Sequence, residues 1–232
     1  MIDKNQARYF ENKKNRYKEN LLLHPPQYTQ EEMQEIIEIL KRRNIKKVID
    51  LGSGNGRLSI PLLQNTIQVT AVDISKKSLD SLQTFVNKIG ISKNMLKTAQ
   101  EMPKNQTAAV VGCDILHHID LDEYLPKMMH VLKPKGVIIF SEPNILNGAW
   151  SILITFTIDW KIEWRIIYCN YFSLYKKLQA NNFTKISIKG LGLVPPPLLN
   201  SFSFFQKINY FLGNLFFLKL FAYRYIIVAE KR

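Results

Sequence analysis

The stretch VIDLGSGNGR, residues 48–57, decides the fold of this chain. A run of mostly apolar, β-branched residues leads into a turn with a glycine at every second position, and a helical pattern follows it. Glycine lets the main chain turn tightly and lets a ligand approach the backbone closely. The start of the helix adds free N–H groups and positive potential. The stretch therefore predicts a strand, a ligand-binding turn and a helix.

Three classes of ligand compete for this turn. A phosphate-binding P-loop needs a Gly-Lys-Ser/Thr ending, which is absent here. The dinucleotide fingerprint G-x-G-x-x-G needs a third glycine at the position of Arg57. The observed spacing is G-x-G-x-G, and the carboxylate of Asp50 in the preceding strand would repel a pyrophosphate. Asp50 suits a ligand that presents an ammonium group there, as the amino-acid end of S-adenosylmethionine does.

The chain around this turn alternates between strands and helices. Asp73 ends the next apolar run, VTAVD, where its carboxylate can accept hydrogen bonds from ribose hydroxyls. Strands that are apolar throughout and separated by helices indicate a parallel sheet that is covered on both faces. The predicted strands span residues 47–51, 68–72, 95–98, 108–112, 137–140, 183–189 and 223–229, and the predicted helices of this region span 57–64, 75–89 and 121–132.

The N-terminal segment predicts helices that precede the sheet. Residues 4–19 suit a short helix, and residues 20–29 suit a loop. The capping box that begins at Thr29 predicts a second helix, which ends near residues 41–43. Residues 146–169 alternate in the manner of a strand or hairpin, although a helix is expected at that place, and both alternatives stay open. Ser173 is the expected cap of a helix to Ala180, and residues 198–221 form a very apolar helical stretch after three prolines.

The composition limits the classes of protein to which this chain can belong. The chain has 232 residues, of which 46% are hydrophobic and 22% charged, so we expect one globular domain. Its two cysteines, Cys113 and Cys169, make no disulfide framework and lack zinc-site spacing. The polar N-terminus and the absence of a long apolar run predict a cytoplasmic protein. The net charge of +13 does not form a stripe with aromatic residues, so nucleic acid is a disfavoured partner.

At this point the sequence resembles the class I S-adenosylmethionine-dependent methyltransferases of the small-molecule type. The segments VIDLGSGNGRLSIPLL, VTAVDIS, LKTAQEMP, AAVVGCDILHHI and HVLKPKGVIIFSEPN carry the resemblance. It implies a three-layer, Rossmann-like α/β sandwich, with a mostly parallel seven-stranded sheet, an antiparallel last strand and helices on both faces. It divides the single domain into an N-terminal helical cap (1–44), a cofactor-binding core (45–145), a lid and helix (146–182), and closing strands (183–232) with an apolar insertion (195–221).

The resemblance also implies roles for particular residues. Asp50 would bind the methionine amine, Asp73 the ribose, and the three glycines would give close backbone contacts. The family often has Asp at the position of Thr98, so recognition of adenine here is expected to rest on backbone groups. It also often has Asp at the position of Ala108, where the residue is usually structural. The residues expected to bind S-adenosylmethionine are Asp50, Leu51, Gly52, Gly54, Gly56, Asp73, Ile74, Thr98, Ala99, Gly112 and Cys113.

Two adjacent histidines follow the fourth predicted strand, where the methyl group should point. Histidine titrates near neutral pH, so both are candidates for the general base, with His118 as the first choice and His117 as the second. The alternative is that either histidine packs internally or caps the next helix. Asp114 suits a surface or capping role, and Glu142 could hold a substrate or be satisfied by local backbone.

The acceptor of the methyl group stays open among three hypotheses. The segment GCDI (112–115) lacks the Asn/Asp-Pro-Pro motif of amino-directed DNA methylases, and neither cysteine follows a proline as in the cytosine C5 type. The first hypothesis is a small, apolar or lipid-like acceptor. The second is a peripheral membrane enzyme that acts on a lipid or quinone and contacts the bilayer through residues 198–221. The third is a non-catalytic module that binds RNA or protein. The alternative for residues 198–221 is a helix that completes the core of the sheet or forms the interface of a homodimer.

Overall fold

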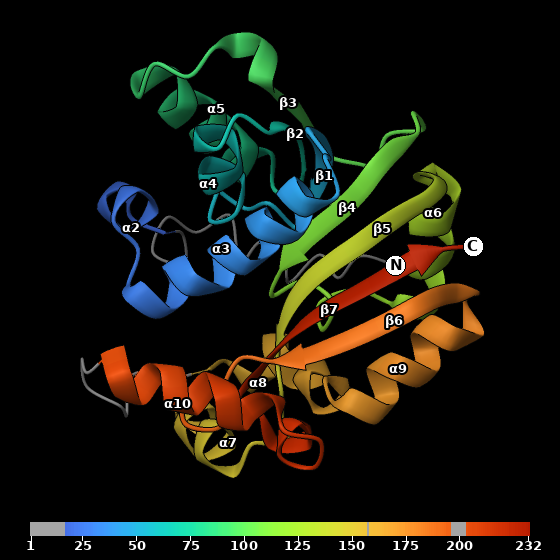
Figure 1. The fold of residues 1–232 in the computed structure, drawn as a ribbon. Coiled ribbons are helices and arrows are strands. Elements are labelled where there is room, and N and C mark those ends of the chain that lie inside the picture. Colours follow the sequence, from blue (N-terminus) through green and yellow to red (C-terminus); the bar gives the residue numbers. More distant parts are fainter. Residues whose placement is uncertain (1–16, 157, 196–202) are drawn as a thin grey trace.

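A seven-stranded sheet forms the centre of the computed structural model, which describes residues 17–156, 158–195 and 203–232 (Figure 1). Its strand order is β3-β2-β1-β4-β5-β7-β6. All neighbours pair in parallel except β7, which runs antiparallel to both β5 and β6. The expected sheet with an antiparallel last strand is therefore confirmed. The strands are β1 (Lys47–Leu51), β2 (Gln68–Val72), β3 (Leu96–Ala99), β4 (Thr107–Cys113), β5 (Leu132–Pro143), β6 (Phe183–Gly190) and β7 (Arg224–Lys231).

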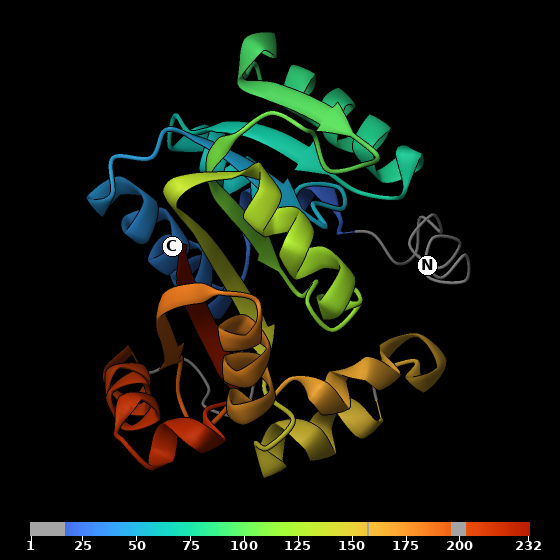
Figure 2. The ribbon, with the colours of Figure 1, turned by 90° about the vertical axis from the view of Figure 1, so that its right-hand side faces the viewer.

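Helices cover both faces of this sheet. Helices α3 (Gln27–Arg42), α4 (Ser59–Gln64) and α5 (Lys76–Lys88) bury their apolar residues on one face. Helices α6 (Leu121–Val131) and α9 (Tyr171–Ala180) do so on the other, the face seen in Figure 2. Successive side chains of a strand point to opposite faces of the sheet, so neighbouring residues belong to different hydrophobic cores. Ile139 lies in the core that contains α3, α4 and α5, and Ile138 lies in the core that contains α6 and α9.

The start of the chain differs from its prediction. The predicted helix 4–19 lies mostly outside the described residues, and the predicted loop 20–29 contains the short helix α2 (Glu19–Leu23). Helix α3 begins at Gln27, with Pro26 rather than Thr29 in the capping position. The fixed backbone angle of proline suits a helix start, and the capping position lies three residues before the predicted one, which leaves Thr29 buried inside the helix.

The segment whose alternation suggested a hairpin is helical. It contains α7 (Gly148–Thr155), α8 (Trp160–Glu163) and the 3-10 helix η3 (Trp164–Tyr168). Asn147 accepts a hydrogen bond from the N–H of Trp150, and Asp159 accepts one from Lys161, so a polar cap starts each α-helix. Asn170, not Ser173, caps α9, and it does so by accepting from the N–H of Ser173.

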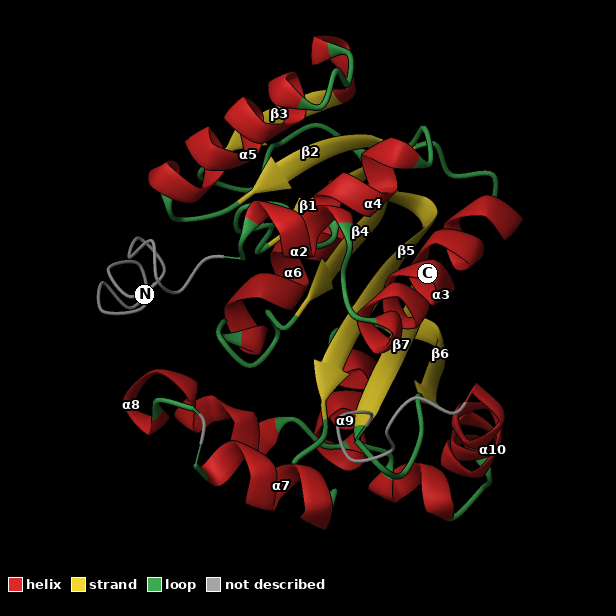
Figure 3. Ribbon diagram, turned by 90° about the vertical axis from the view of Figure 1, so that its left-hand side faces the viewer, coloured by secondary structure: helices red, strands yellow, loops and turns green. Residues whose placement is uncertain are grey.

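The apolar stretch near the C-terminus is helical but interrupted. Its described part forms α10 (Ser203–Asn214) and the 3-10 helix η5 (Leu218–Phe221), separated by a turn. Figures 1 and 3 show α7, α8 and α10 gathered beyond the carboxyl end of β5. A further 3-10 helix, η2 (Lys93–Met95), precedes β3. In the described part of the chain, no helix combines the length and the apolar character needed to cross a bilayer.

Candidate active site

A cavity of about 1280 Å³ lies at the carboxyl ends of the parallel strands. This is the edge at which open α/β sheets bind their ligands. The glycine turn and the end of β2 line one part of the cavity, and the segment after β4 lines another. Residues of α2, α7 and α8 complete the wall. The cavity is therefore shared between the sheet and the helices that cover its end.

The glycine turn is held in a conformation that only glycine adopts without strain. Gly52, Gly54 and Gly56 have φ angles of 71°, 51° and 113°. A Cβ atom on Gly52 would lie 2.5 Å from Ile115, and one on Gly56 would lie 2.6 Å from Leu82. A Cβ atom on Gly54 would meet no protein atom within 4 Å. Gly54 is thus the glycine whose open side a ligand can approach.

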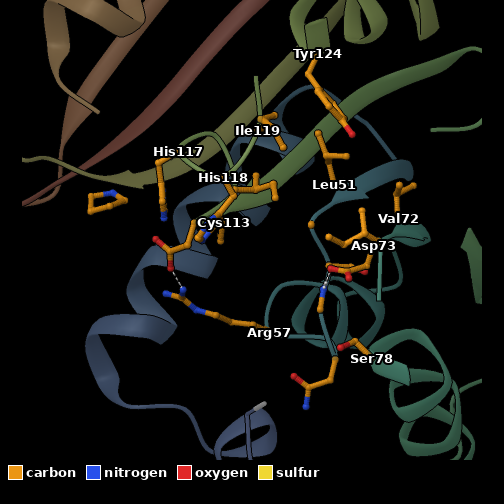
Figure 4. Close-up of a pocket in the computed structure, with 18 of the residues that line it drawn as sticks. Leu51, Arg57, Val72, Asp73, Ser78, Cys113, His117, His118, Ile119 and Tyr124 are labelled. Carbon is orange, nitrogen blue, oxygen red and sulfur yellow. Dashed lines mark hydrogen bonds and ion pairs between the residues drawn. The ribbon is translucent and has the colours of Figure 1, made fainter. Parts of the chain in front are cut away.

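Asp73 ties the end of β2 to this turn. Its Oδ2 accepts a hydrogen bond of 2.8 Å from the N–H of Gly54, and its Oδ1 accepts one of 2.8 Å from Ser75 (Figure 4). Burial raises the pKa of the Asp73 carboxyl, while the two backbone donors act against that rise. Asp73 lines the cavity beside Gly54, so the predicted ribose-binding residue also positions the turn.

Asp50 lies beneath the turn and is fully buried. Its Oδ2 accepts a hydrogen bond of 2.6 Å from the Ser59 hydroxyl at the start of α4. Burial raises the pKa of Asp50 to about 7, and the nearby charge of Asp73 adds to the rise. Asp50 does not line the cavity in the described structure. A contact between Asp50 and the amine of a ligand therefore remains a prediction.

The other residues predicted to bind the cofactor divide into two groups. Leu51, Ile74 and Cys113 line the cavity, whereas Gly56, Thr98, Ala99 and Gly112 do not. Gly112 is packed tightly, since a Cβ there would lie 2.7 Å from the carbonyl oxygen of Leu51. The cavity wall near β3 comes from residues 100–104, just after the predicted adenine pair. A contact of Thr98 and Ala99 with adenine therefore stays a prediction.

Two buried polar atoms beside the turn have no hydrogen-bond partner among the described residues, namely the Ser53 hydroxyl and Nε of Arg57. Both residues line the cavity, and a buried donor without a partner is costly. With the open side of Gly54 and the carboxylate of Asp73, they fit a ligand that carries an amino acid and a ribose. S-adenosylmethionine has both groups, so the site fits this cofactor. The sequence prediction missed Ser53 and Arg57, although both lie within the glycine motif.

Arg57 also belongs to a buried network of four charges. It pairs with Glu32 of α3 at 2.8 Å and with Asp114 after β4. Arg224 at the start of β7 pairs with the same two acids, at 2.8 Å in the case of Glu32. The two arginines keep the pKa of Asp114 well below its usual range against the opposing effect of burial. The expected surface or capping role of Asp114 is therefore wrong, because it is an ion-pair partner.

His117 is clamped between two carboxylates. Its Nδ1 lies 2.7 Å from Oε2 of Glu142, and its Nε2 lies 3.1 Å from Oε2 of Glu163. Glu142 is fully buried and accepts backbone hydrogen bonds of 2.7 Å from Ile115 and Leu116. Burial disfavours the charged imidazolium, but the charge of Glu142 outweighs burial, so the pKa of His117 lies well above its usual value. Glu142 therefore has its partners within the chain.

His118 has the opposite electrostatic character. Its ring lies 4.1 Å from the ring of His117, centroid to centroid, and its Nε2 lies 3.4 Å from Glu163. Burial, and then the charge of His117, lower the pKa of His118 to about 4. Both histidines line the cavity that Asp73 also lines (Figure 4). The pair thus places a charged and a neutral imidazole side by side at neutral pH.

Comparisons with known proteins agree with this site. Residues 48–136 match the family described as a methyltransferase domain. Two similar relatives are the ubiquinone biosynthesis O-methyltransferases of Rickettsia felis and Rickettsia akari. Each is 26% identical over 175 residues, which cover 72% of this chain and 72% and 70% of the respective relatives.

Solved structures share the fold at lower identity. A SAM-dependent methyltransferase from Thermotoga maritima superposes with a TM-score of 0.66 at 12% identity, covering 98% of this chain and all of that one. Magnesium protoporphyrin IX methyltransferase from Synechocystis PCC 6803, solved with bound SAM, has a TM-score of 0.56 at 19% identity and covers 88% and 80% of the two chains. Residues 48–136 thus match a methyltransferase domain, and the chain shares its fold with solved S-adenosylmethionine-dependent methyltransferases.

Proposed function

We propose that this methyltransferase transfers the methyl group to a hydroxyl oxygen of a small, largely apolar acceptor. Relatives at about a quarter identity are named O-methyltransferases, which favours oxygen as the accepting atom. The covering helices present Ile154, Ile158 and Ile166 to the cavity, which favours an apolar acceptor body. The observation that carries the proposal is the geometry of two adjacent histidines that both line the cavity, of which His117 is held by Glu142 and Glu163.

A hydroxyl group is a weak nucleophile until it loses its proton. His118 lines the cavity, and burial and the charge of His117 lower its pKa to about 4, so its ring is neutral at pH 7 and can accept that proton, as a weaker base than a free imidazole. The charged His117 beside it stays fixed by Glu142 and Glu163 and cannot act as the base. Such a division of pKa values between neighbouring groups is a recurrent way to assign acid and base roles.

S-adenosylmethionine, when bound, supplies an electrophilic methyl group on a positively charged sulfur. The residues of the chain then have three tasks. Ser53, Gly54 and Asp73 hold the cofactor at the end of β1 and β2. The covering helices exclude water from the cavity and orient the acceptor. His118 would take the proton from the acceptor hydroxyl, and the bound cofactor would supply the methyl group to the same oxygen.

Trp150 of α7 is the proposed contact to a polar atom of the acceptor. Its indole Nε1 is buried and has no hydrogen-bond partner among the described residues, and the residue lines the cavity. Indole N–H is a donor only, so it requires an acceptor atom such as an oxygen. An apolar acceptor molecule with one oxygen near Trp150 would satisfy this group.

The proposal is tested by incubating the purified chain with methyl-labelled S-adenosylmethionine and a fractionated cell extract. We expect label in the organic-soluble fraction, as an alkali-stable methyl ether. The Gly54→Val variant serves as the inactive control, because a side chain there would occupy the open approach to the turn. Label in RNA or protein would contradict the small-molecule acceptor, and an N-methyl product would contradict transfer to oxygen.

A further inference from the structure

The helices at the carboxyl end of the sheet expose an unusual number of large apolar side chains. Phe156 at the end of α7 is 86% exposed, and Phe216 and Phe217 between α10 and η5 are 74% and 73% exposed. Together with their neighbours they form what we call the apolar end surface. Its members are Ile152, Phe156, Trp160, Trp164, Ile167, Tyr168, Phe172, Phe205, Ile208, Phe211, Leu215, Phe216, Phe217 and Phe221.

Two segments far apart in the sequence meet in this surface. The side chain of Asn147, the cap of α7, donates hydrogen bonds of 2.6 Å to the carbonyl oxygens of Phe221 and Leu193. The ammonium group of Lys219 on η5 lies 5.0 Å from the ring of Tyr171 at the start of α9. All the helices involved lie at one end of the molecule in Figures 1 and 3. The segments that carry the surface therefore contact each other at η5 and α7.

Basic side chains are set among the exposed rings. The guanidinium of Arg165 lies 5.4 Å from the ring of Trp164, and Lys219 also lies 5.8 Å from the ring of Phe216. Lys161 and Lys207 are exposed on α8 and α10. Lysine and arginine can lay their apolar stems along such a surface and keep the charge at its edge. The exposed charge interleaved with the rings is therefore mainly positive, with Asp159 beside Trp160 as the one exposed acid among the described residues of these segments.

The two acids of the α8 region are both engaged within the chain, although Asp159 is exposed. Asp159 accepts a hydrogen bond from the N–H of Lys161 as the cap of α8, and Glu163 contacts both histidines of the site. Residues 205–221 contain no acid at all. The C-terminal part of the chain, 133–232, holds 13 Lys and Arg against 4 Asp and Glu. A second copy of the chain would bring the same positive charge, whereas an anionic surface would neutralise it.

We propose that the apolar end surface docks on the surface of a lipid bilayer that contains anionic lipids. Exposed aromatic and aliphatic residues insert at the level of the head groups, and Lys161, Arg165, Lys207 and Lys219 contact lipid phosphates. The rings of Trp164 and Tyr168 pack edge to face at 6.1 Å, and both residue types favour the interface between lipid and water. This inference goes beyond the transfer reaction and does not depend on it.

Docking would also place the cavity next to the bilayer. Helix α7 exposes Ile152 and Phe156 on its outer side, while Trp150 and Ile154 of the same helix line the cavity. An acceptor dissolved in the lipid would then reach the site without crossing water. This last consequence rests on the proposed apolar acceptor, whereas the docking itself does not.

Vesicle co-sedimentation of the full chain tests the docking. We expect binding to vesicles of phosphatidylcholine mixed with phosphatidylglycerol, weaker binding to phosphatidylcholine alone, and loss of binding as salt is raised. Phe216→Ser with Phe217→Ser should weaken binding about tenfold, because two exposed rings can no longer insert. Lys161→Glu with Lys219→Glu should weaken it by at least as much.

A charge-matched control separates local contact from net charge. Lys93→Glu with Lys97→Glu makes the same change in charge on exposed residues near β3, at the opposite edge of the sheet, and should leave binding within about threefold. Binding of S-adenosylhomocysteine by calorimetry should be the same in all these variants, which distinguishes loss of docking from loss of the site. Equal loss in both charge variants would overturn the proposal. So would a dimer in sedimentation velocity that the two phenylalanine substitutions dissociate, with no vesicle binding.

Discussion

The glycine turn with its strands presents several polar groups to the cavity, whereas the helices that cover them present mostly apolar side chains and one buried indole N–H, that of Trp150. Around the turn, the hydroxyl of Ser53 and Nε of Arg57 are buried, lack partners in the described structure and lie at the cavity. In the covering helices, polar residues such as Asn147 hold the backbone, and apolar rings face outward. A cofactor with a fixed polar structure is recognised by a short local motif. The proposed apolar acceptor and the proposed bilayer would be contacted by side chains that follow no local motif.

The largest effect should come from His118, which lies where the two regions meet. His118→Gln should lower kcat about 10²- to 10⁴-fold, because glutamine cannot take the hydroxyl proton. Binding of S-adenosylhomocysteine should change little, which calorimetry checks. His24→Gln, an exposed histidine outside the cavity, is the matched control. Equal turnover in both variants would exclude His118 as the base.

The pH dependence sharpens the same assignment. Since the pKa of His118 is lowered to about 4, the neutral base persists from pH 8 down to about pH 5. The rate should therefore stay level across that range and fall below it as His118 gains a proton. A rate that rises with pH through 6.5 would instead indicate an unperturbed histidine.

The next effect concerns the open side of the turn. Gly54→Val should weaken binding of S-adenosylhomocysteine at least 100-fold, because the new side chain occupies the approach to the backbone. Gly90→Val is the matched control, since Gly90 also has a positive φ (75°) and open space around a Cβ but lies away from the cavity. Both variants should lose similar stability in thermal unfolding. Equal affinity of both variants for S-adenosylhomocysteine would show that the turn does not bind the cofactor.

Asp50 tests whether a buried charge supports the cofactor. Asp50→Asn should weaken cofactor binding about tenfold if the carboxylate faces the amine of the ligand. Burial raises the folded-state pKa of Asp50 to about 7, so the folded chain binds an extra proton between pH 4 and 7 and loses stability as the pH rises through that range. The variant without cofactor should therefore be more stable than the parent at pH 8. An unchanged affinity of Asp50→Asn for the cofactor would show that Asp50 contacts Ser59 and not the cofactor.

The smallest effect is expected in the covering helices. Trp150→Phe should raise KM for the acceptor about five- to tenfold with little change in kcat, because one hydrogen bond to the acceptor is lost. Trp160→Phe is the control, since its Nε1 already donates to the carbonyl oxygen of Thr155 and the residue lies outside the cavity. A fall in kcat without a change in KM would contradict a role in acceptor binding.

The sequence predicted the sheet well because its strands carry their own signals. The predicted bounds of β1 and β2 are those of the structure, and α5 begins one residue after Ser75, its capping residue. Buried parallel strands are continuous apolar runs, and glycines mark the turn after the first of them. The same local signals located Asp73, Leu51 and both histidines at the cavity.

The remainder of the site depends on contacts across long stretches of sequence. Glu163 reaches the histidines from 45 or more residues away, and Arg224 reaches Asp114 across 110 residues. The hairpin alternative for residues 146–169 was wrong because alternation and helical spacing coincide there, and the caps Asn147 and Asp159 decide between them. Contacts between residues that lie so far apart in the sequence leave no local pattern from which they could be predicted.

The position of β7 in the sheet has a consequence for how the chain is made. A ribosome delivers β6 before β7, yet β6 pairs only with β7 among the described strands. Until Arg224–Lys231 emerge, β6 has no neighbour in the sheet and the acids Glu32 and Asp114 lack their second arginine. The cofactor turn is synthesised early, but the site closes only with the last strand. A nascent chain therefore exposes unpaired β-edges and apolar helices late in its synthesis, the period in which a chaperone is most useful to it.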